Sequence, residues 1–282
     1  MQIEVLQPDA VLTALNQELV AGKLIFPTQV DVALRVQRAL EDPDVHLQEA
    51  ARIVANEPLL AAKTLAMANS AAIRQQGPEV RDLVRAVNRL GIGTLRTLAV
   101  TLVLRQIIYA EPRRIEAHIA AALWVHAVHI AALASALARR TRTLDPQEAL
   151  VAGLLHDIGH FYLLSRSHLY PMLLDRAHPA SALVYTDHAY VSRAVMKSLD
   201  VPQTIIEATE ESDLYGPLFP PRSLADAVSL AHLITPFGNP LVDEDAVDSA
   251  AALSDGREIQ GLAEFAEEAR QEVESLAQAL NA

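Results

Sequence analysis

Apolar residues recur along most of this chain at the three- and four-residue spacing of an amphipathic helix. The stretch from Leu95 to Ile107 places its apolar side chains on one helical stripe, and the stretch from Ile259 to Leu280 does the same near the C-terminus. Alternation of apolar and polar residues, which marks a half-buried strand, is almost absent; the nearest case, Leu183 to Tyr185, is short. The pattern therefore predicts an all-α protein with about a dozen helices joined by short loops.

Local signals predict where some of these helices begin and end. Asp145 followed by Pro146 is typical of a helix start, because the carboxylate caps free N–H groups and proline suits the first helical position. Gly91 predicts a helix end, since glycine readily takes the left-handed conformation. Asn69 and Ser70 are expected to end another helix by hydrogen bonding to its backbone.

Composition and charge exclude several classes of protein. A chain that is 51% apolar and 21% charged is expected to fold and not to remain disordered. The absence of cysteine excludes disulfides, a thiolate metal site and a cysteine nucleophile. A net charge of −12 argues against nucleic acid as a partner, because phosphate contacts need basic side chains. Residues 241–282 hold 11 acidic and 2 basic residues, which predicts a solvated acidic helix at the C-terminus.

Neither a secretory signal nor a membrane span is expected. The first residues of the chain lack the basic and apolar regions of a signal sequence. The apolar stretch from Ile119 to Ala138 is rich in alanine and contains His126 and His129, which would be costly in hydrocarbon. We expect this stretch to form a buried central helix.

The candidate chemistry lies in histidines on successive predicted helices. His126 lies on the central helix, His156, Asp157 and His160 on the next, and further histidines on later helices. Because His156 and His160 are four residues apart, they are expected to share one helix face. Histidine and carboxylate ligands together suit zinc, manganese or iron. A metal site is one interpretation; a structural one, in which Asp157 caps a helix or pairs with and orients His156, stays open.

Several short motifs, read in order along the chain, resemble one known family. They run over Phe26–Val30, Ile53–Leu60, Leu65–Ser70, Ala86–Gly91 and Leu154–Gly159, with later matches at Leu123–His126, Asp187–Ala189 and Val201–Pro202. In this order they resemble the HDOD domain, a bacterial signalling module related to the HD superfamily of metal-dependent phosphohydrolases. The resemblance covers roughly residues 18–235.

This resemblance implies a fold, a domain organisation and a function. It implies an HD-like bundle of helices with an N-terminal helical lobe. We expect an N-terminal helical extension at 1–17, the HDOD domain at 18–240 with its lobes divided near residue 112, and the acidic tail at 241–282. It also implies a cytoplasmic, non-catalytic regulatory module that acts on a signalling protein partner, without nucleic acid or membrane. Whether the protein forms a homo-oligomer stays open.

The resemblance also assigns a set of site residues. The ligands of the HD metal site fall on five positions, where His232 stands in place of an aspartate: His126, His156, Asp157, His188 and His232. At two further positions of the pocket, the residue in this chain differs from the residue that the related enzymes carry. His160 stands where HD enzymes commonly carry a lysine that could stabilise a phosphoryl transition state, and Glu211 stands where HD-GYP phosphodiesterases carry paired histidines.

These departures favour a vestigial site without a required cofactor, although manganese, iron or zinc could still bind there. The alternative is a metal-dependent phosphohydrolase with a divergent ligand set that acts on a nucleotide or cyclic dinucleotide. A third interpretation is a sensor that binds a small ligand in the same pocket without turnover.

Overall fold

The computed structural model describes residues 44–56, 58–74, 77–109, 114–199, 201–212, 217–242 and 261–281, together with residues 13, 15, 17–20, 36, 39, 40 and 42. Helices dominate these residues and no strand occurs among them, which confirms the all-α fold. Most of the predicted extension at residues 1–17, the Phe26–Val30 motif and the expected division near residue 112 lie outside the described residues.

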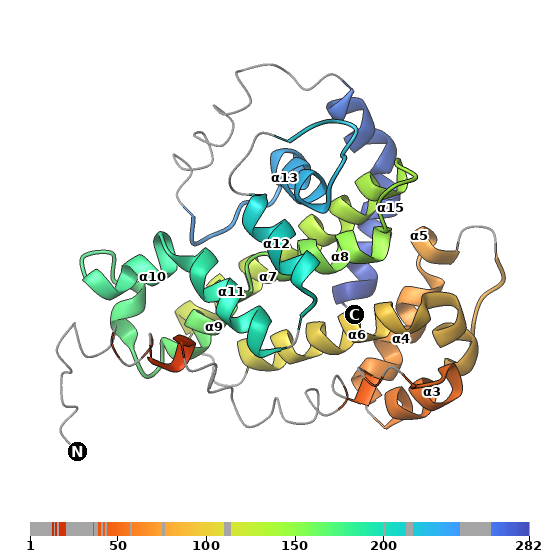
Figure 1. Cartoon of the computed structure of the whole chain (residues 1–282), viewed down its shortest axis with the longest axis horizontal. Coiled ribbons are helices and arrows are strands. Elements are labelled where there is room, and N and C mark those ends of the chain that lie inside the picture. The colour runs from red at the N-terminus through yellow and green to blue at the C-terminus, as the bar shows by residue number, and fades with distance from the viewer. Residues whose placement is uncertain are drawn as a thin grey trace.

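Figure 1 shows the arrangement of the described helices. They are α3 (Leu47–Ala55), α4 (Pro58–Asn69), α5 (Ala71–Arg74), α6 (Leu83–Tyr109), α7 (Arg114–Arg139), α8 (Pro146–Leu155), α9 (Ile158–Arg166), α10 (Ala182–Tyr185), α11 (His188–Ser198), α12 (Gln203–Glu211), α13 (Leu224–Ile234) and α15 (Leu262–Asn281). Two short 3₁₀ turns, Pro171–Leu174 and Pro179–Ser181, precede α10. In Figure 1, α3 to α5 lie at one end and α9 to α11 at the other, with α7 and α8 between them.

The local signals act as expected at most helix ends. The Asp145 carboxylate accepts a hydrogen bond from the backbone N–H of Gln147 at 2.7 Å and so caps α8. Gly91 has a φ of 78°, which ends one helix and lets a second begin at once within α6. Leu183 to Tyr185, the strand-like stretch, is helical.

The prediction for the end of α4 was half right. Ser70 does bond to the last turn, because its hydroxyl donates to the carbonyl of Met67 at 2.8 Å. Asn69 instead forms a two-way pair with the backbone of Val80: its amide donates to the Val80 carbonyl at 2.7 Å and accepts from the Val80 N–H at 2.8 Å. Asn69 therefore holds the segment before α6 against α4, a long-range contact that local sequence does not reveal.

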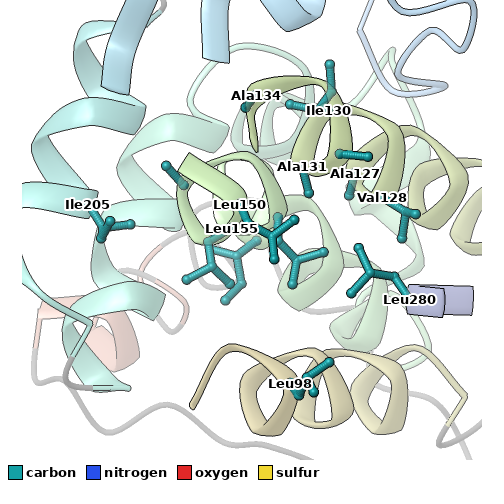
Figure 2. Close-up of a cluster of buried hydrophobic side chains, with 14 of the residues drawn as sticks. Leu98, Ala127, Val128, Ile130, Ala131, Ala134, Leu150, Leu155, Ile205 and Leu280 are labelled. Atoms are coloured by element: carbon teal, nitrogen blue, oxygen red, sulfur yellow. The ribbon is translucent and has the colours of Figure 1, made fainter. Parts of the chain in front are cut away.

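Helix α7 forms the centre of the hydrophobic core. Its small side chains let α8 approach closely, and α13 and α15 also pack against it. Figure 2 shows its buried residues facing Leu150 and Leu155 of α8, with Leu98 of α6 and Leu280 of α15 nearby. Among the described residues, the segment Ala117–Arg139 is the one helix long and apolar enough to cross a membrane, and most of it is buried inside the protein. This burial is typical of the core helix that the sequence predicted.

The acidic C-terminal helix lies on the body of the protein. Its apolar stripe is buried against α4, α5, α7 and α13, with Phe265 only 3% exposed. Arg139, at the end of α7, forms an ion pair with Glu272 at 3.2 Å, and Arg140 pairs with Glu268. At the far end of α15, the fully buried ammonium of Lys63 donates to the carbonyl of Leu280 at 2.6 Å. Arg139 and Arg140 lie at the C-terminal end of α7, where positive charge suits the helix dipole, and they also anchor α15.

Candidate functional site

The adjacent pair His156 and Asp157 lies at a break between two helices. Helix α8 ends at Leu155 with His156 as its C-cap, and α9 begins at Ile158 with Asp157 in the N-cap position. The expectation that His156 and His160 share one helix face is therefore wrong, because the chain changes direction between them. Asp157 makes no capping hydrogen bond with its side chain, which removes capping from the interpretations left open.

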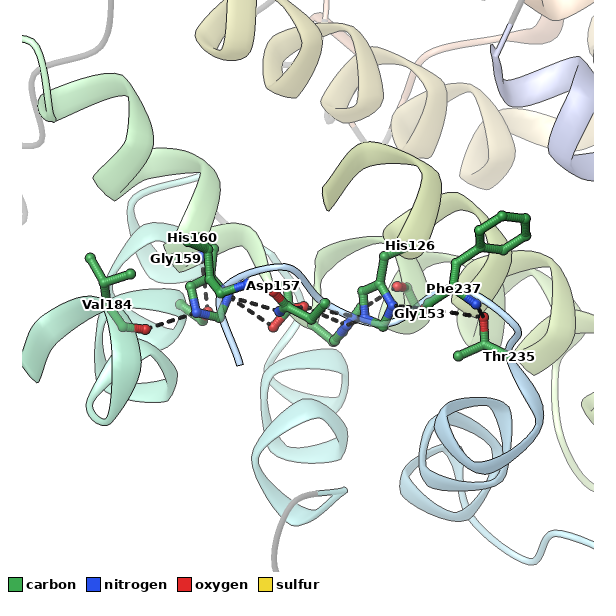
Figure 3. Close-up of polar contacts among 12 residues, drawn as sticks. His126, Gly153, Asp157, Gly159, His160, Val184, Thr235 and Phe237 are labelled. Carbon is green, nitrogen blue, oxygen red and sulfur yellow. Dashed lines mark hydrogen bonds and ion pairs between the residues drawn. The ribbon is translucent and has the colours of Figure 1, made fainter. Parts of the chain in front are cut away.

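The Asp157 carboxylate is instead the centre of a buried cluster of imidazoles. Its Oδ2 lies 3.0 Å from Nε2 of His156 and 3.4 Å from Nε2 of His126, while its Oδ1 lies 3.2 Å from Nδ1 of His160. The carboxylate is 4% exposed, and none of these imidazoles is more than 9% exposed. Figure 3 shows this row of side chains, brought together from α7, the α8–α9 junction and α9.

In each of these three histidines, the ring nitrogen that does not face Asp157 forms a hydrogen bond with a backbone carbonyl. Nδ1 of His126 lies 2.7 Å from the carbonyl of Phe237, and Nδ1 of His156 lies 2.6 Å from that of Gly153. Nε2 of His160 lies 2.9 Å from the carbonyl of Val184. A carbonyl can only accept, so each of these nitrogens carries a hydrogen, and the nitrogen that faces Asp157 is the one left to bind a proton or an ion.

Two further predicted ligands, His188 and His232, flank this row. The His232 ring lies 4.7 Å from that of His156 and 5.3 Å from that of His126, and the His188 ring stacks on His160 at 4.2 Å. Nδ1 of His188 and Nε2 of His232 are buried and have no hydrogen-bond partner among the described residues. The five predicted ligands therefore lie close together, and His160 lies among them. We call these six residues the histidine–aspartate cluster: His126, His156, Asp157, His160, His188 and His232.

Burial and neighbouring charges shift the pKa values of three members of this cluster. Burial alone would raise the pKa of Asp157, but the charges of His156 and His160, with hydrogen bonds from His126 and His156, hold that pKa well below 3.8. Burial, assisted by the charge of His160, lowers the pKa of His188 from 6.5 to about 4. Burial and the charges of His156 and His126 lower the pKa of His232 well below 6.5. At neutral pH the cluster thus combines a carboxylate with two uncharged imidazoles, the forms that bind metal ions.

The donor atoms of the cluster fit a divalent transition metal. With both Nδ1 atoms donating to carbonyls, Nε2 of His126 and Nε2 of His156 lie 3.2 Å apart and both face Asp157 Oδ2. Three acceptors cannot converge without a proton or a cation among them. Two ligand groups have donor atoms within 4.8 Å of one another: His126, His156 and His232 form the first, and Asp157, His160 and His188 form the second.

The two additional pocket residues have different surroundings. His160 is fully buried in the cluster. Glu211 is exposed at the last position of α12 and belongs to neither ligand group. The structure thus brings His160 together with the five predicted ligands but does not bring Glu211 to them.

Sequence reasoning missed three contributors to the cluster. Asn239 donates to Asp157 Oδ2 at 2.5 Å, and the carbonyl of Phe237 accepts from His126. Ser192 of α11 accepts from the N–H of Gly159 at 2.9 Å and so holds α9 beside α11. A carbonyl is common to every residue, so no sequence signal could have identified Phe237. Asn239 lies within the proline- and glycine-containing run Thr235–Pro240, a composition that indicates a loop and no particular contact.

Comparison with known proteins identifies relatives of this fold. The model of the HDOD domain family matches residues 26–214. The search of the curated proteins found no match.

Among solved structures, a "putative metal-dependent phosphohydrolase" from Shewanella amazonensis SB2B is similar with a TM-score of 0.69 and 22% identity, over 97% of this chain and 99% of that one. An HDOD domain protein of unknown function from Geobacter sulfurreducens has a TM-score of 0.56 and 20% identity, over 95% of this chain and 98% of that one. A "putative signal transduction protein" from Marinobacter aquaeolei VT8 has a TM-score of 0.58 and 20% identity, over 100% of this chain and 68% of that one. At these identities the likeness concerns the fold.

Proposed function

Since the chain belongs to the HDOD domain family, we propose that it is a regulatory module of signal transduction that acts by binding a partner protein and not by turnover. In this proposal the histidine–aspartate cluster is a structural core that can hold one divalent transition metal. The similarity in fold to a protein described as taking part in signal transduction is consistent with this role.

The observation that carries the proposal is the environment of His160. An enzyme that cleaves phosphate esters needs a cationic or hydrogen-bonding group that reaches the transferred phosphoryl group. His160 stands at the position where such a lysine would be expected, yet it is fully buried. One of its ring nitrogens bonds to the Val184 carbonyl and the other lies 3.2 Å from Asp157 Oδ1. A substrate phosphate would have to displace these contacts before meeting the side chain.

The Asp157 carboxylate is also fully engaged. Its two oxygens face His126, His156 and His160, and Asn239 covers Oδ2 from a segment after α13. A catalytic metal site keeps a ligand position open to water and substrate. A buried and internally bonded carboxylate supports a structural use of the cluster.

A divalent metal would be held by His126, His156 and Asp157, with His232 beside them. Such an ion, when bound, supplies a positive charge that neutralises the carboxylate and can polarise a bound oxygen. The protein's own contribution is to orient the ligands, because the Phe237 and Gly153 carbonyls fix the tautomers of His126 and His156. These ligands come from α7, α13 and the α8–α9 junction, so metal binding would stabilise the packing of these helices.

A metal-dependent phosphohydrolase is the second candidate. The observation that favours it is the convergence of imidazole and carboxylate donors, which is the ligand chemistry of such enzymes. The two candidates differ in whether the loaded cluster turns over a phosphate ester.

The test is hydrolysis by the full chain loaded with Mn²⁺, Fe²⁺ or Zn²⁺. Bis(p-nitrophenyl) phosphate, nucleotides and cyclic dinucleotides serve as substrates, and Asp157→Asn serves as the matched control. We expect the wild-type rate to equal that of the control. A metal-dependent rate that Asp157→Asn abolishes would overturn the non-catalytic proposal in favour of the second candidate.

A genetic experiment tests the regulatory role directly. In the organism that carries the gene, transcript levels are compared between wild type, a deletion strain and a strain that expresses Asp157→Asn at wild-type level. We expect the deletion to change transcript levels and Asp157→Asn to restore them, because signalling needs the folded surface and not the carboxylate. If the variant behaves like the deletion although it is folded and abundant, the role of the cluster is not structural.

A further inference from the structure

A short segment after α13 lies against the histidine–aspartate cluster. This strap, residues 235–241, contacts the cluster at two points. The carbonyl of Phe237 accepts a hydrogen bond from Nδ1 of His126 at 2.7 Å, and the side-chain amide of Asn239 lies against Asp157. Figure 3 shows the strap passing beside the cluster at Phe237. One segment thus contacts two predicted ligands that lie on different elements of the fold.

The orientation of the Asn239 amide follows from its neighbours. Its Oδ1 accepts from the backbone N–H of Leu241 at 2.8 Å, which only an oxygen can do. Its Nδ2 therefore faces the cluster, where it lies 2.5 Å from Asp157 Oδ2 and 3.3 Å from His160 Nδ1. Leu241 is only 2% exposed, so the backbone group that holds the amide is itself fixed in the protein. Asn239 thus donates a hydrogen bond to one defined oxygen of Asp157.

That oxygen, Oδ2, is the one that faces two imidazole nitrogens. It lies 3.0 Å from Nε2 of His156 and 3.4 Å from Nε2 of His126, and these two nitrogens lie 3.2 Å apart. With metal–ligand bonds of about 2.1 Å, neighbouring ligands lie about 3.0 Å apart in octahedral coordination and about 3.4 Å apart in tetrahedral coordination. The three atoms therefore have the spacing of neighbouring ligands around one ion. A carboxylate oxygen has two lone pairs, so Oδ2 can accept from Asn239 and still offer the other pair to an ion.

We propose that Asn239 is a positioning residue that holds Oδ2 of Asp157 at the spacing which a metal ion between Asp157, His126 and His156 requires. This inference rests on the proposed capacity of the cluster to hold a metal, and it adds a residue that sets the affinity. Without the amide, the carboxylate can turn about its Cβ–Cγ bond and lose this spacing. Outer hydrogen-bond partners of ligating side chains raise metal affinity by about 10–100-fold.

The coupling between the strap and the metal acts in both directions. If the closed strap raises the metal affinity by a given factor, a bound ion lowers the equilibrium constant for opening of the strap by the same factor. The backbone N–H of Leu241 reports this opening, because Oδ1 of Asn239 protects it. The strap also carries Phe237, whose side chain is on the surface. A metal ion in the cluster therefore holds this part of the surface in place.

The first test measures the affinity of the full-length protein for Zn²⁺ by competition with a fluorescent chelator. Wild type is compared with Asn239→Leu, which keeps the approximate size of the side chain and removes its donor, and with Asn239→Ala. Asn88→Ala, at an exposed position on α6, is the matched control. Circular dichroism establishes that each variant is folded. We expect a dissociation constant about 10–100-fold higher in both Asn239 variants and unchanged in Asn88→Ala.

Hydrogen exchange in the wild-type protein gives a second measurement that needs no variant. Nuclear magnetic resonance compares amide exchange in the metal-free and the Zn²⁺-loaded protein, since Zn²⁺ is diamagnetic. We expect the Leu241 N–H to exchange about 10–100-fold more slowly in the loaded protein. The N–H of Arg85 is the matched control, because it also bonds to a side-chain oxygen, that of Asp82, at an exposed position on α6. Its exchange rate should not change.

The possible outcomes separate this inference from the proposed function. Equal affinities in all four proteins overturn the role of Asn239, even if its variants are less stable, and so does an unchanged exchange rate at Leu241. Tighter binding by the Asn239 variants also overturns it, because the amide would then compete with the ion for Oδ2. Each of these results leaves the metal capacity intact. No zinc bound by any protein overturns both the inference and the metal capacity, whereas the hydrolysis and transcript experiments test the non-catalytic regulatory role separately.

Discussion

Gly159 provides the sharpest test of how the cluster is supported. This residue, two positions after Asp157, lies where α9 crosses α11. A Cβ added at Gly159 would lie 2.6 Å from the carbonyl oxygen of His188, 2.6 Å from the N atom of Ser192 and 2.7 Å from its Oγ. Two of these atoms belong to the backbone, so a side-chain rotation cannot relieve the overlap. Gly159→Ala must therefore push α9 away from α11.

The size of the effect follows from these distances. Ordinary contacts between heavy atoms need about 3.5 Å, so the two helices must separate by nearly 1 Å. Overpacking of this kind costs about 1–3 kcal/mol. Loss of the hydrogen bond from the Gly159 N–H to Ser192 Oγ costs about 1 kcal/mol more. Alanine returns about 0.5–1 kcal/mol as a better helix former. We expect Gly159→Ala to lower the free energy of unfolding by about 1–3.5 kcal/mol.

Urea unfolding followed by circular dichroism measures this change. Gly93→Ala is the matched control, because position 93 is an exposed site in α6 where an added Cβ meets nothing within 4 Å. The control should leave stability unchanged or raise it by about 0.5–1 kcal/mol. If Gly159→Ala unfolds at the same urea concentration as wild type, then α9 and α11 are not in the close contact on which the position of His188 depends.

Three further predictions address the C-terminal helix and the buried imidazoles. Lys63→Ala should destabilise the protein by about 2–4 kcal/mol, because it leaves a cavity at a buried position and removes this hydrogen-bond donor from the Leu280 carbonyl. Amide hydrogen exchange in α15 should become faster in this variant, and an unchanged exchange rate would contradict the prediction. Arg140→Ala should cost less than about 1 kcal/mol in urea unfolding, since its pair with Glu268 is about half exposed; a larger loss would mean that this pair dominates the docking of α15. The metal-free protein should lose stability as pH falls from 6.5 to about 4, because the unfolded state binds a proton at His188 that the folded state, with its lowered pKa, does not. At about 1.4 kcal/mol per pKa unit, the loss in the free energy of unfolding amounts to about 3 kcal/mol. Urea midpoints that do not change over this pH range would refute the prediction.

The sequence by itself determined the fold class, the family and the group of candidate ligands. Helical periodicity predicted α7 as a buried central helix and α15 as an amphipathic tail, and both are present. The cap at Asp145 and the helix end at Gly91 were also predictable, since each depends on the intrinsic preferences of one or two residues. The five ligand positions were implied by the resemblance to the HDOD domain, and their side chains do lie close together.

Only the tertiary structure decided how those side chains meet. The helix break between His156 and Asp157 places His126 and His156 on one side of the carboxylate and His160 on the other, although sequence spacing favoured a shared face for His156 and His160. The hydrogen bond from the Asn239 amide, in the segment after α13, to Asp157 joins positions 82 residues apart. Helix periodicity and caps arise from neighbouring residues, and so a sequence records them. Contacts between distant segments depend on how whole helices pack and on backbone groups that every residue carries, so they emerge only once the chain is folded.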